Sequence, residues 1–257
     1  MSYFGNGKQG EKIFRGAYTL ARNNNIYSEE TFDVYRDKKD MTYIFESEMI
    51  SRVSTGELLT ININYKINKD YIPLEVDVKR SLGSMNVMES YLFDQRTTRI
   101  NYSFFDGKDK VETEFATSPK FYITTPATCC SMLYLRSKKF DPTSKNYYSI
   151  YTSKNMWEYK EDPVLKNIMV QRISPTSENL KVDGSNLQSI QYKLQEQTSD
   201  NMDDKKPVEL AKGQLRATPV DEVRIWTSQH MTIPYLIKAN DGTKIQVKYL
   251  NNLSQDQ

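Results

Sequence analysis

The stretch Thr60–Ile67, T-I-N-I-N-Y-K-I, decides the fold class because its side chains alternate between polar and apolar. The apolar positions, which share one side of an extended strand, are Ile61, Ile63, Tyr65 and Ile67. A period of two with one apolar side is typical of a strand in an antiparallel sheet that is buried on one face and wet on the other. This stretch therefore predicts a half-buried strand.

The same alternation recurs along the chain, and short turn signals separate the runs. Further alternating runs are Leu74–Val78, Ile100–Phe104, Val111–Phe115 and Ile245–Tyr249. The turn signals are Arg22–Asn25, Asp37–Asp40, Thr55–Gly56, Asn68–Asp70, Asp106–Gly107, Asp183–Gly184 and Asp241–Gly242. Asp-Gly pairs supply the positive φ angles that tight hairpins need, and such spacing fits about a dozen strands. We expect an all-β chain: a large antiparallel up-and-down meander forming a curved half-barrel or open barrel, with little helix.

Three segments are less regular. Residues 128–139 predict either a helix or a strand, because Ser-Met-Leu-Tyr-Leu suits both. Residues 1–12 are Gly-rich and polar and predict a flexible N-terminus. Residues 13–253 would form a single antiparallel β domain with a long polar loop at about 195–213. That loop could instead mark a boundary between two domains, but one C-terminal hairpin would not fold alone.

Charge and cysteine content restrict the environment and the partners. The chain has 35 basic and 33 acidic residues, a net charge of +2, so nothing calls for nucleic acid as a partner. No apolar run approaches the roughly 20 residues of a membrane span, and the N-terminus lacks a secretory signal. Cys129 and Cys130 are adjacent and unsuited to a disulfide. We expect a cytoplasmic protein in which both cysteines pack as small apolar groups.

No catalytic or metal-binding motif is present. His230 is the only histidine, no G-x-S-x-G nucleophile motif occurs, and one histidine with two adjacent cysteines cannot build an ordinary zinc site. The glycines of Gly5–Gly10 neither follow a strand nor precede a capped helix, so they predict a flexible end and not a phosphate loop. We expect no metal, no cofactor and no catalysis, although a carboxylate pair assembled by the fold, as in a hydrolase, has no local signature.

The order of features in the chain resembles a known group. It includes Asp70–Glu75 (D-Y-I-P-L-E) opening a strand and Ser131–Asp141 in the middle. The closing segments are Val223–Thr227 with its tryptophan, Thr232–Leu236 with its proline, and Asp241–Ile245. This spacing is similar to that of bacterial β-rich proteins of unknown function akin to lipoprotein-carrier (LolA-like) half-barrels and, more loosely, to lipocalins. The resemblance implies a curved sheet whose apolar concave face holds a lipid or covers a partner. Such proteins are usually exported, and here this sequence departs from them.

Two functions follow from these features. The first is a non-catalytic binding protein that holds an apolar, lipid-like ligand on the concave face of a curved sheet. Its candidate ligand-binding residues, which lie on or beside the apolar phase of their strands, are Tyr65, Tyr102, Phe104 and Trp226. The alternative for each is simple core packing. The second function is a structural or adaptor subunit of a larger cytoplasmic assembly, with protein partners bound by edge-strand pairing.

Overall fold

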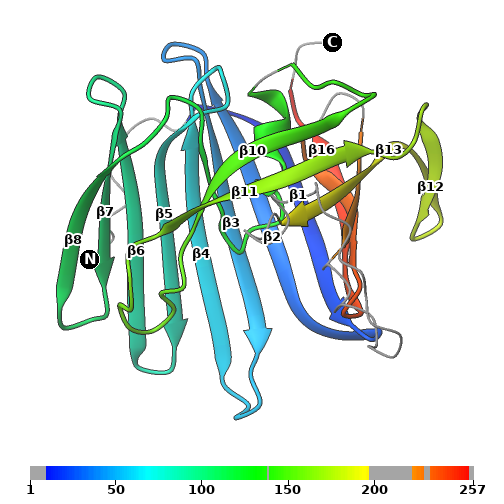
Figure 1. Ribbon diagram of the computed structural model, residues 1–257. Helices are drawn as coiled ribbons and strands as arrows, with labels where there is room; N and C mark the ends of the chain where they lie inside the picture. The colour runs from blue at the N-terminus through cyan, green and yellow to red at the C-terminus, as the bar shows by residue number, and fades with distance from the viewer. Residues whose placement is uncertain (1–9, 138, 197–221, 229–231, 255–257) are drawn as a thin grey trace, which may run out of the picture.

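The computed structural model describes residues 10–137, 139–196, 222–228 and 232–254. Its first half is a run of antiparallel hairpins in which each strand pairs with the next (Figure 1). The strands are β1 (Glu11–Arg22), β2 (Asn25–Asp37), β3 (Thr42–Arg52), β4 (Leu58–Ile67), β5 (Pro73–Leu82), β6 (Met85–Asp94), β7 (Arg99–Phe105) and β8 (Lys110–Ala116). The alternating runs therefore become neighbouring strands, as predicted.

The second half contains shorter strands and one turn of 3₁₀ helix. These elements are β9 (Tyr122–Ile123), η1 (Leu133–Arg136), β10 (Lys145–Thr152), β11 (Val164–Arg172), β12 (Glu178–Val182), β13 (Ser185–Glu196), β14 (Val223–Thr227), β15 (Pro234–Ala239) and β16 (Thr243–Asn252). One half of β13 pairs with β12 and the other half with β11. The regular secondary structure of the described residues is thus almost entirely β-strand.

All strands belong to one open sheet. Its order is β8-β7-β6-β5-β4-β3-β2-β1-β16-β15-β14-β13-β11-β10-β9, with β12 attached to β13 beside this path. The first and last strands are neighbours, because β1 pairs with β16 along Phe14–Arg22. Among the described strands, β9 and β10 pair in parallel and the other pairs are antiparallel. The predicted all-β, mostly antiparallel meander is confirmed, and the sheet does not close into a barrel.

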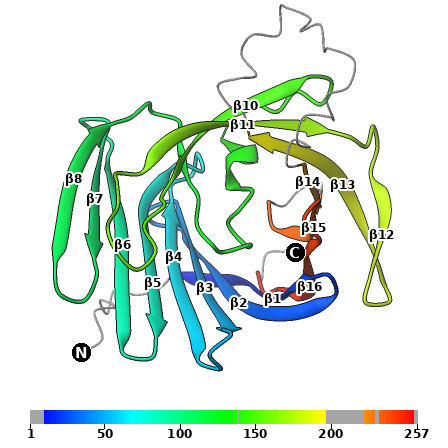
Figure 2. The same ribbon diagram turned by 60° about the horizontal axis from the view of Figure 1, so that its bottom comes forward.

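The sheet curls so far that one of its ends lies inside the curve. Figure 2 shows the strands surrounding a central space that the segment around η1 enters. The end strand β9 lies in that space, against β4: the Tyr65 hydroxyl donates to the carbonyl of Ile123 at 3.1 Å and accepts from its N–H at 3.2 Å. The edge of β9 is therefore covered by the sheet itself. The other end, β8, lies on the outside (Figure 1).

The concave, or inner, face carries the hydrophobic core. The predicted apolar phase is buried on β4 and β7, where Tyr65 and Ile100 are at most 2% exposed. The main cluster joins these strands to the middle of the chain, through Phe121, Cys129 and Leu133. Because every second residue of a strand faces the same way, the opposite phase forms the polar outer face. The half-buried character that the alternation predicts is thus observed.

The last strand departs from the predicted alternation at one position. Ile245, Val247 and Tyr249 were expected on one face, but Tyr249 is 43% exposed. Tyr18 pairs with Val247 and Ala17 with Tyr249, so β16 has one extra residue opposite β1. A β-bulge of this kind shifts the phase of the side chains beyond it. The prediction for Tyr249 is wrong for this reason.

The middle segment is neither the α-helix nor the strand that residues 128–139 allowed. Its described part forms turns and the short helix η1, whose backbone bonds run from Leu135 to Met132 and from Ser137 to Tyr134. A turn that the sequence analysis missed joins β5 to β6 at Gly83, which has a φ of +57°. Glycine adopts such angles without the strain that a Cβ would bring.

Some sequence predictions lie mostly or wholly outside the described residues. They are the flexible N-terminus at 1–12, of which 1–9 are not described, and the polar loop at 195–213, of which 197–213 are not described. His230 also lies outside them. Within the described ranges, β1 begins at Glu11 and β13 ends at Glu196.

Candidate ligand-binding site

The inner face of the sheet is covered by the middle of the chain, residues 117–137 and 139–163, which we call the cover (Figure 2). A buried carboxylate holds part of this cover in place. Glu30, on β2 and 0% exposed, accepts from the backbone N–H of Thr128 at 2.8 Å and of Cys129 at 3.2 Å, and from the Ser47 hydroxyl at 3.0 Å. Burial raises the pKa of the Glu30 carboxyl, although the hydrogen bonds oppose this shift.

The two cysteines lie in this cover and are free thiols. Cys129 is 0% exposed and Cys130 6%. Burial raises the pKa of the Cys129 thiol well above its ordinary value, and its neighbours Cys130 and Glu30 raise it further. A thiol of high pKa has little thiolate and is a poor nucleophile or metal ligand. Both cysteines belong to the main hydrophobic cluster, so they pack as small apolar side chains, as their sequence context predicted.

Between the cover and the C-terminal strands lies a cavity of about 260 Å³, which we call the apolar chamber. Its walls come from β4, β9, the residues between β9 and η1, η1 itself, β10, β11 and β13–β15. They are formed by Tyr65, Tyr122, Ile123, Thr124, Thr125, Cys130, Ser131, Tyr134, Ile150, Ile168, Leu194, Val223, Ile225 and Ile237. The lining is mainly aliphatic and aromatic, which is the usual composition of a small-molecule pocket.

The polar groups of the chamber wall are largely engaged by the protein itself. The Tyr65 hydroxyl bonds the backbone of Ile123, and the Thr124 hydroxyl donates to the carbonyl of Tyr151 at 2.6 Å. The Tyr122 hydroxyl donates to the carbonyl of Tyr134 at 3.5 Å, and burial raises the pKa of Tyr122 to about 12. Because these groups already have partners, the chamber offers a ligand mainly apolar contacts.

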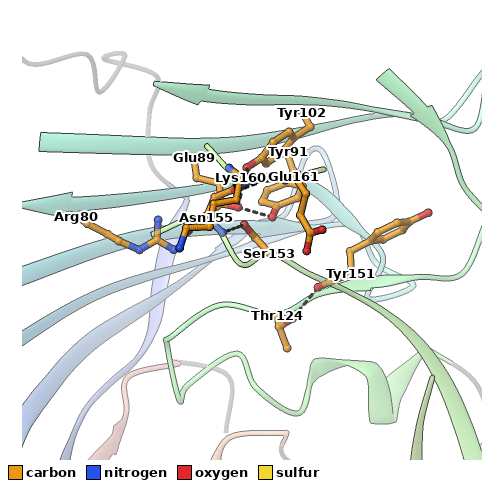
Figure 3. A network of polar contacts seen from close by, with 10 residues as sticks. All are labelled: Arg80, Glu89, Tyr91, Tyr102, Thr124, Tyr151, Ser153, Asn155, Lys160 and Glu161. Atoms are coloured by element: carbon orange, nitrogen blue, oxygen red, sulfur yellow. Dashed lines mark hydrogen bonds and ion pairs between the residues drawn. The ribbon is translucent and has the colours of Figure 1, made fainter. Parts of the chain in front are cut away.

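A second feature of the inner face is a buried ion pair between β5 and β6 (Figure 3). The Arg80 guanidinium donates through Nη2 to Glu89 Oε2 at 3.0 Å. Glu89 Oε1 accepts from the hydroxyls of Tyr91 at 2.7 Å and Tyr102 at 3.2 Å. Burial first, and then the negative charge of Glu89, raise the pKa of both tyrosines, which stay protonated as donors. Both oxygens of the carboxylate are thus occupied.

The side chain of Asn155 ties the loop after β10 to this network. Its Nδ2 donates to the Tyr102 hydroxyl at 2.7 Å and to the carbonyl of Glu161 at 2.8 Å. Its Oδ1 accepts from the backbone N–H of Lys160 at 2.7 Å and of Glu161 at 3.3 Å (Figure 3). A buried amide with both ends satisfied fixes its loop in one position. The loop therefore forms a stable wall over the ion pair.

This wall and the sheet enclose a second cavity of about 360 Å³, which we call the Arg80 pocket. It is lined by Leu59, Ile61, Val78, Arg80, Glu89, Thr124, Thr125, Pro126, Thr152, Ser153, Lys154, Asn155, Met156 and Trp157. Arg80 is 8% exposed, and its Nη1 atom is buried with no hydrogen-bond partner among the described residues. The two cavities share the wall made by Thr124 and Thr125.

The four residues predicted to bind a ligand occupy different places. Tyr65 lines the apolar chamber, and Tyr102 belongs to the Arg80–Glu89 network. Phe104 is buried on the same face with its ring centroid 6.3 Å from that of Tyr159. Trp226 lies on the opposite face of β14 from the buried Ile225, with the Lys238 ammonium 5.7 Å from its ring centroid. The structure thus brings together the first three on the inner face but not Trp226.

Sequence reasoning missed the residues that make the polar site. Arg80 follows Val76 and Val78 on the apolar phase of its strand, and Glu89 stands between Val87 and Tyr91 on theirs. A charged residue on the buried phase of a strand costs free energy unless it is paired. The two charges on apolar phases were therefore the feature of the sequence that could have indicated a polar site. Nothing local indicates that the two charges pair with each other.

Within the described part of the chain, no group of three or more His, Cys, Asp or Glu side chains is placed to hold a metal ion. The described ranges also contain no helix long and apolar enough to cross a membrane.

Comparisons with known proteins relate the chain to others through its fold. No family model matches the sequence, and no curated protein matches it. A similar solved structure is a β-barrel-like protein of the domain of unknown function DUF1849 from Brucella abortus, with a TM-score of 0.57 and 6% identity over 96% of this chain and 100% of that one. Another is a DUF1089 family protein from Pseudomonas aeruginosa, with a TM-score of 0.39 and 13% identity over 64% and 82%.

The Brucella structure supports a β-rich, barrel-like fold of unknown function over nearly the whole chain. Neither neighbour is described as a lipoprotein carrier or a lipocalin. The LolA-like resemblance therefore stays a prediction.

Proposed function

We propose that the protein is a non-catalytic binding protein that holds a small apolar molecule in the apolar chamber. The observation that carries this proposal is the chamber itself, an apolar cavity between the curved sheet and its cover. Because its hydroxyl groups are mostly bonded internally, burial of apolar surface would supply the binding energy. The class of ligand that we propose is therefore more restricted than the lipid-like ligand expected from the sequence: it is a small apolar molecule.

The volume of the chamber limits the size of the ligand. Cavities of about 150 Å³ lined by Leu, Ile and Phe bind benzene, and drug-sized ligands occupy roughly 300–1,000 Å³. At about 260 Å³, the chamber suits a molecule of one or two rings or a short alkyl chain. A complete phospholipid would not fit inside it.

Titration with fluorobenzene, followed by ¹⁹F NMR, tests the proposal. The unmodified protein is expected to bind the probe, and Ile225→Trp, which fills the chamber, is expected to weaken binding by about tenfold or more. Trp226→Phe is the matched control, because it changes the next residue on the opposite face of β14 and should leave binding unchanged. Circular dichroism and a thermal midpoint would establish that both variants are folded.

Absence of binding to the unmodified protein, or equal binding by the folded Ile225→Trp variant, would refute the proposal. Native mass spectrometry of the protein purified from its own cells adds a second readout. An apolar molecule that accompanies the unmodified protein and Trp226→Phe, but not Ile225→Trp, is the expected result.

The adaptor role is a second candidate, supported by the outer edge of β8. Among the described strands, β8 ends the sheet and pairs with β7 alone. An edge strand can accept a strand from a partner, but Lys110, Glu112 and Glu114 place charges along it, which disfavours unspecific pairing. Val111 lies opposite Phe104 in the same ladder phase as the bond from the Thr117 N–H to Thr98, so its own N–H points to β7, whereas that of Glu112 points to the outer edge. Substituting Glu112 by proline therefore removes a backbone donor from the outer edge and keeps the donors that pair with β7. If the adaptor role is correct, this variant should lose a partner that the unmodified protein retains through purification.

A further inference from the structure

The Arg80 pocket contains a buried donor that the protein does not use. Arg80 has two terminal nitrogens: Nη2 bonds Glu89, whereas Nη1 has no partner among the described residues. The guanidinium is a permanent donor, and a buried donor without an acceptor costs about as much as a lost hydrogen bond. Because Arg80 also lines the pocket, an acceptor atom that enters the pocket beside the guanidinium would satisfy this donor.

The neighbouring polar groups do not supply that acceptor. Both oxygens of Glu89 are engaged by Arg80 Nη2 and the two tyrosines. The Thr124 hydroxyl donates to a backbone carbonyl and lies 3.0 Å from the Thr152 hydroxyl. The Ser153 hydroxyl accepts from the N–H of Asn155 at 3.0 Å. Among the buried side-chain atoms of the described lining, Arg80 Nη1 is thus the donor without a partner, and the polar groups beside it are already bonded.

The other walls of the pocket define the rest of the ligand. They include the aliphatic side chains Leu59, Ile61 and Val78 from the sheet and Met156 and Trp157 from the loop above it. Apolar walls around a single donor suit a molecule with an apolar body and one polar end. The pocket volume of about 360 Å³ lies within the usual range for small ligands.

We infer that the Arg80 pocket is a binding site for a small molecule with a hydrogen-bond-accepting oxygen, of a carboxylate or a carboxamide, at the end of a short apolar body. The oxygen bonds Nη1 of Arg80, and the body packs against Trp157 and the sheet. Glu89 already balances the charge of Arg80, so the oxygen need not be charged. This site is separate from the apolar chamber and does not depend on the function proposed for it.

Fluorescence of Trp157 provides a direct readout. The chain has two tryptophans, so Trp226→Phe leaves Trp157, which lines the pocket, as the only one. In this background, hexanoate and hexanamide should change the emission in a saturable way. Hexylamine has the same number of carbon atoms but a cationic donor in place of the acceptor, and it should not bind. Comparing the two acceptors tells whether the site prefers a carboxylate or a carboxamide.

Variants of the ion pair test the role of Arg80. The double change Arg80→Leu with Glu89→Gln removes both charges together, because loss of Arg80 alone would leave a buried carboxylate unpaired. We expect about a tenfold or larger loss of affinity for both acceptors. Lys248→Gln with Glu29→Gln is the matched control, since it removes both charges of an exposed ion pair whose residues line neither cavity. This variant should bind as the parent does.

A second variant tests the same site if Arg80→Leu with Glu89→Gln does not fold. Leu59→Phe narrows the pocket, leaves the ion pair intact and changes only a partly exposed residue. It should lose hexanoate and hexanamide binding while it keeps the thermal midpoint of the parent. It should also bind fluorobenzene normally, because Leu59 does not line the apolar chamber.

Three results would overturn the inference. They are no saturable response to either acceptor, a response to hexylamine equal to that of hexanoate, and binding by the folded Arg80→Leu with Glu89→Gln variant that equals binding by the Lys248→Gln with Glu29→Gln control. Failure of fluorobenzene binding alone would count against the apolar chamber and not against this site.

Discussion

Replacing Glu30 by glutamine should destabilise the protein by an amount that depends on pH. Each carboxylate oxygen of Glu30 accepts hydrogen bonds from different donors. Oε2 accepts from the N–H of Thr128, and Oε1 accepts from the N–H of Cys129 and from the Ser47 hydroxyl. Glutamine keeps one acceptor oxygen and puts an NH₂ group in the other position. With its oxygen toward Thr128, the N–H of Cys129 loses its acceptor, at a cost of about 1–3 kcal/mol for a buried group.

The pH dependence follows from the raised pKa of Glu30. A carboxyl whose pKa is higher in the folded state than the ordinary 4.5 holds its proton more tightly there than in the unfolded chain. Stability therefore falls as the pH rises from about 4.5 toward the folded pKa, with a limiting slope of about 1.4 kcal/mol per pH unit. Glutamine does not titrate, so the stability gap between wild type and Glu30→Gln should narrow as pH increases through this window.

Urea unfolding of both proteins at half-unit steps from pH 4.5 to 7.5 measures this gap. Glu29→Gln is the matched control, because Glu29 is the preceding residue but its side chain is 57% exposed, where it pairs with Lys248. The control should change stability by about 0.5 kcal/mol or less, which is typical of an exposed pair. A gap for Glu30→Gln that stays constant or widens between pH 4.5 and 7.5 would refute the reasoning.

Three further changes test other parts of the fold. Tyr65→Phe removes the hydroxyl that bonds the backbone of β9 in both directions and should cost about 2 kcal/mol or more in urea unfolding. Gly16→Ala would place a methyl group 2.4 Å from the Phe32 ring, so we expect a loss of about 1–3 kcal/mol and a lower thermal midpoint. Arg80→Leu alone should lower the free energy of unfolding by about 3–5 kcal/mol, because it leaves the Glu89 carboxylate buried without its partner. In a double-mutant cycle, adding Glu89→Gln should restore much of this stability, and additive losses would contradict the buried pair.

The local features of the fold could be predicted from the sequence. The alternation in Thr60–Ile67 predicted a strand with Tyr65 on the buried side, and the Asp-Gly pairs predicted turns such as that at Gly184, which has a φ of +82°. These features depend on residues a few positions apart, because side chains alternate on any extended strand and glycine tolerates positive φ in any turn. The sequence by itself therefore determined the all-β class, the run of hairpins and much of the core.

Only the tertiary structure decided which distant segments meet. β1 pairs with β16, and Glu30 contacts Thr128, which is 98 residues away in the sequence. No sequence pattern in either segment of these pairs indicates its partner. The same holds for both cavities, whose walls come from both halves of the chain. A charge on the buried phase of a strand shows in the sequence that a partner is needed. The curvature of the whole sheet determines which residue becomes that partner, because contacts across the interior depend on geometry that no local pattern encodes.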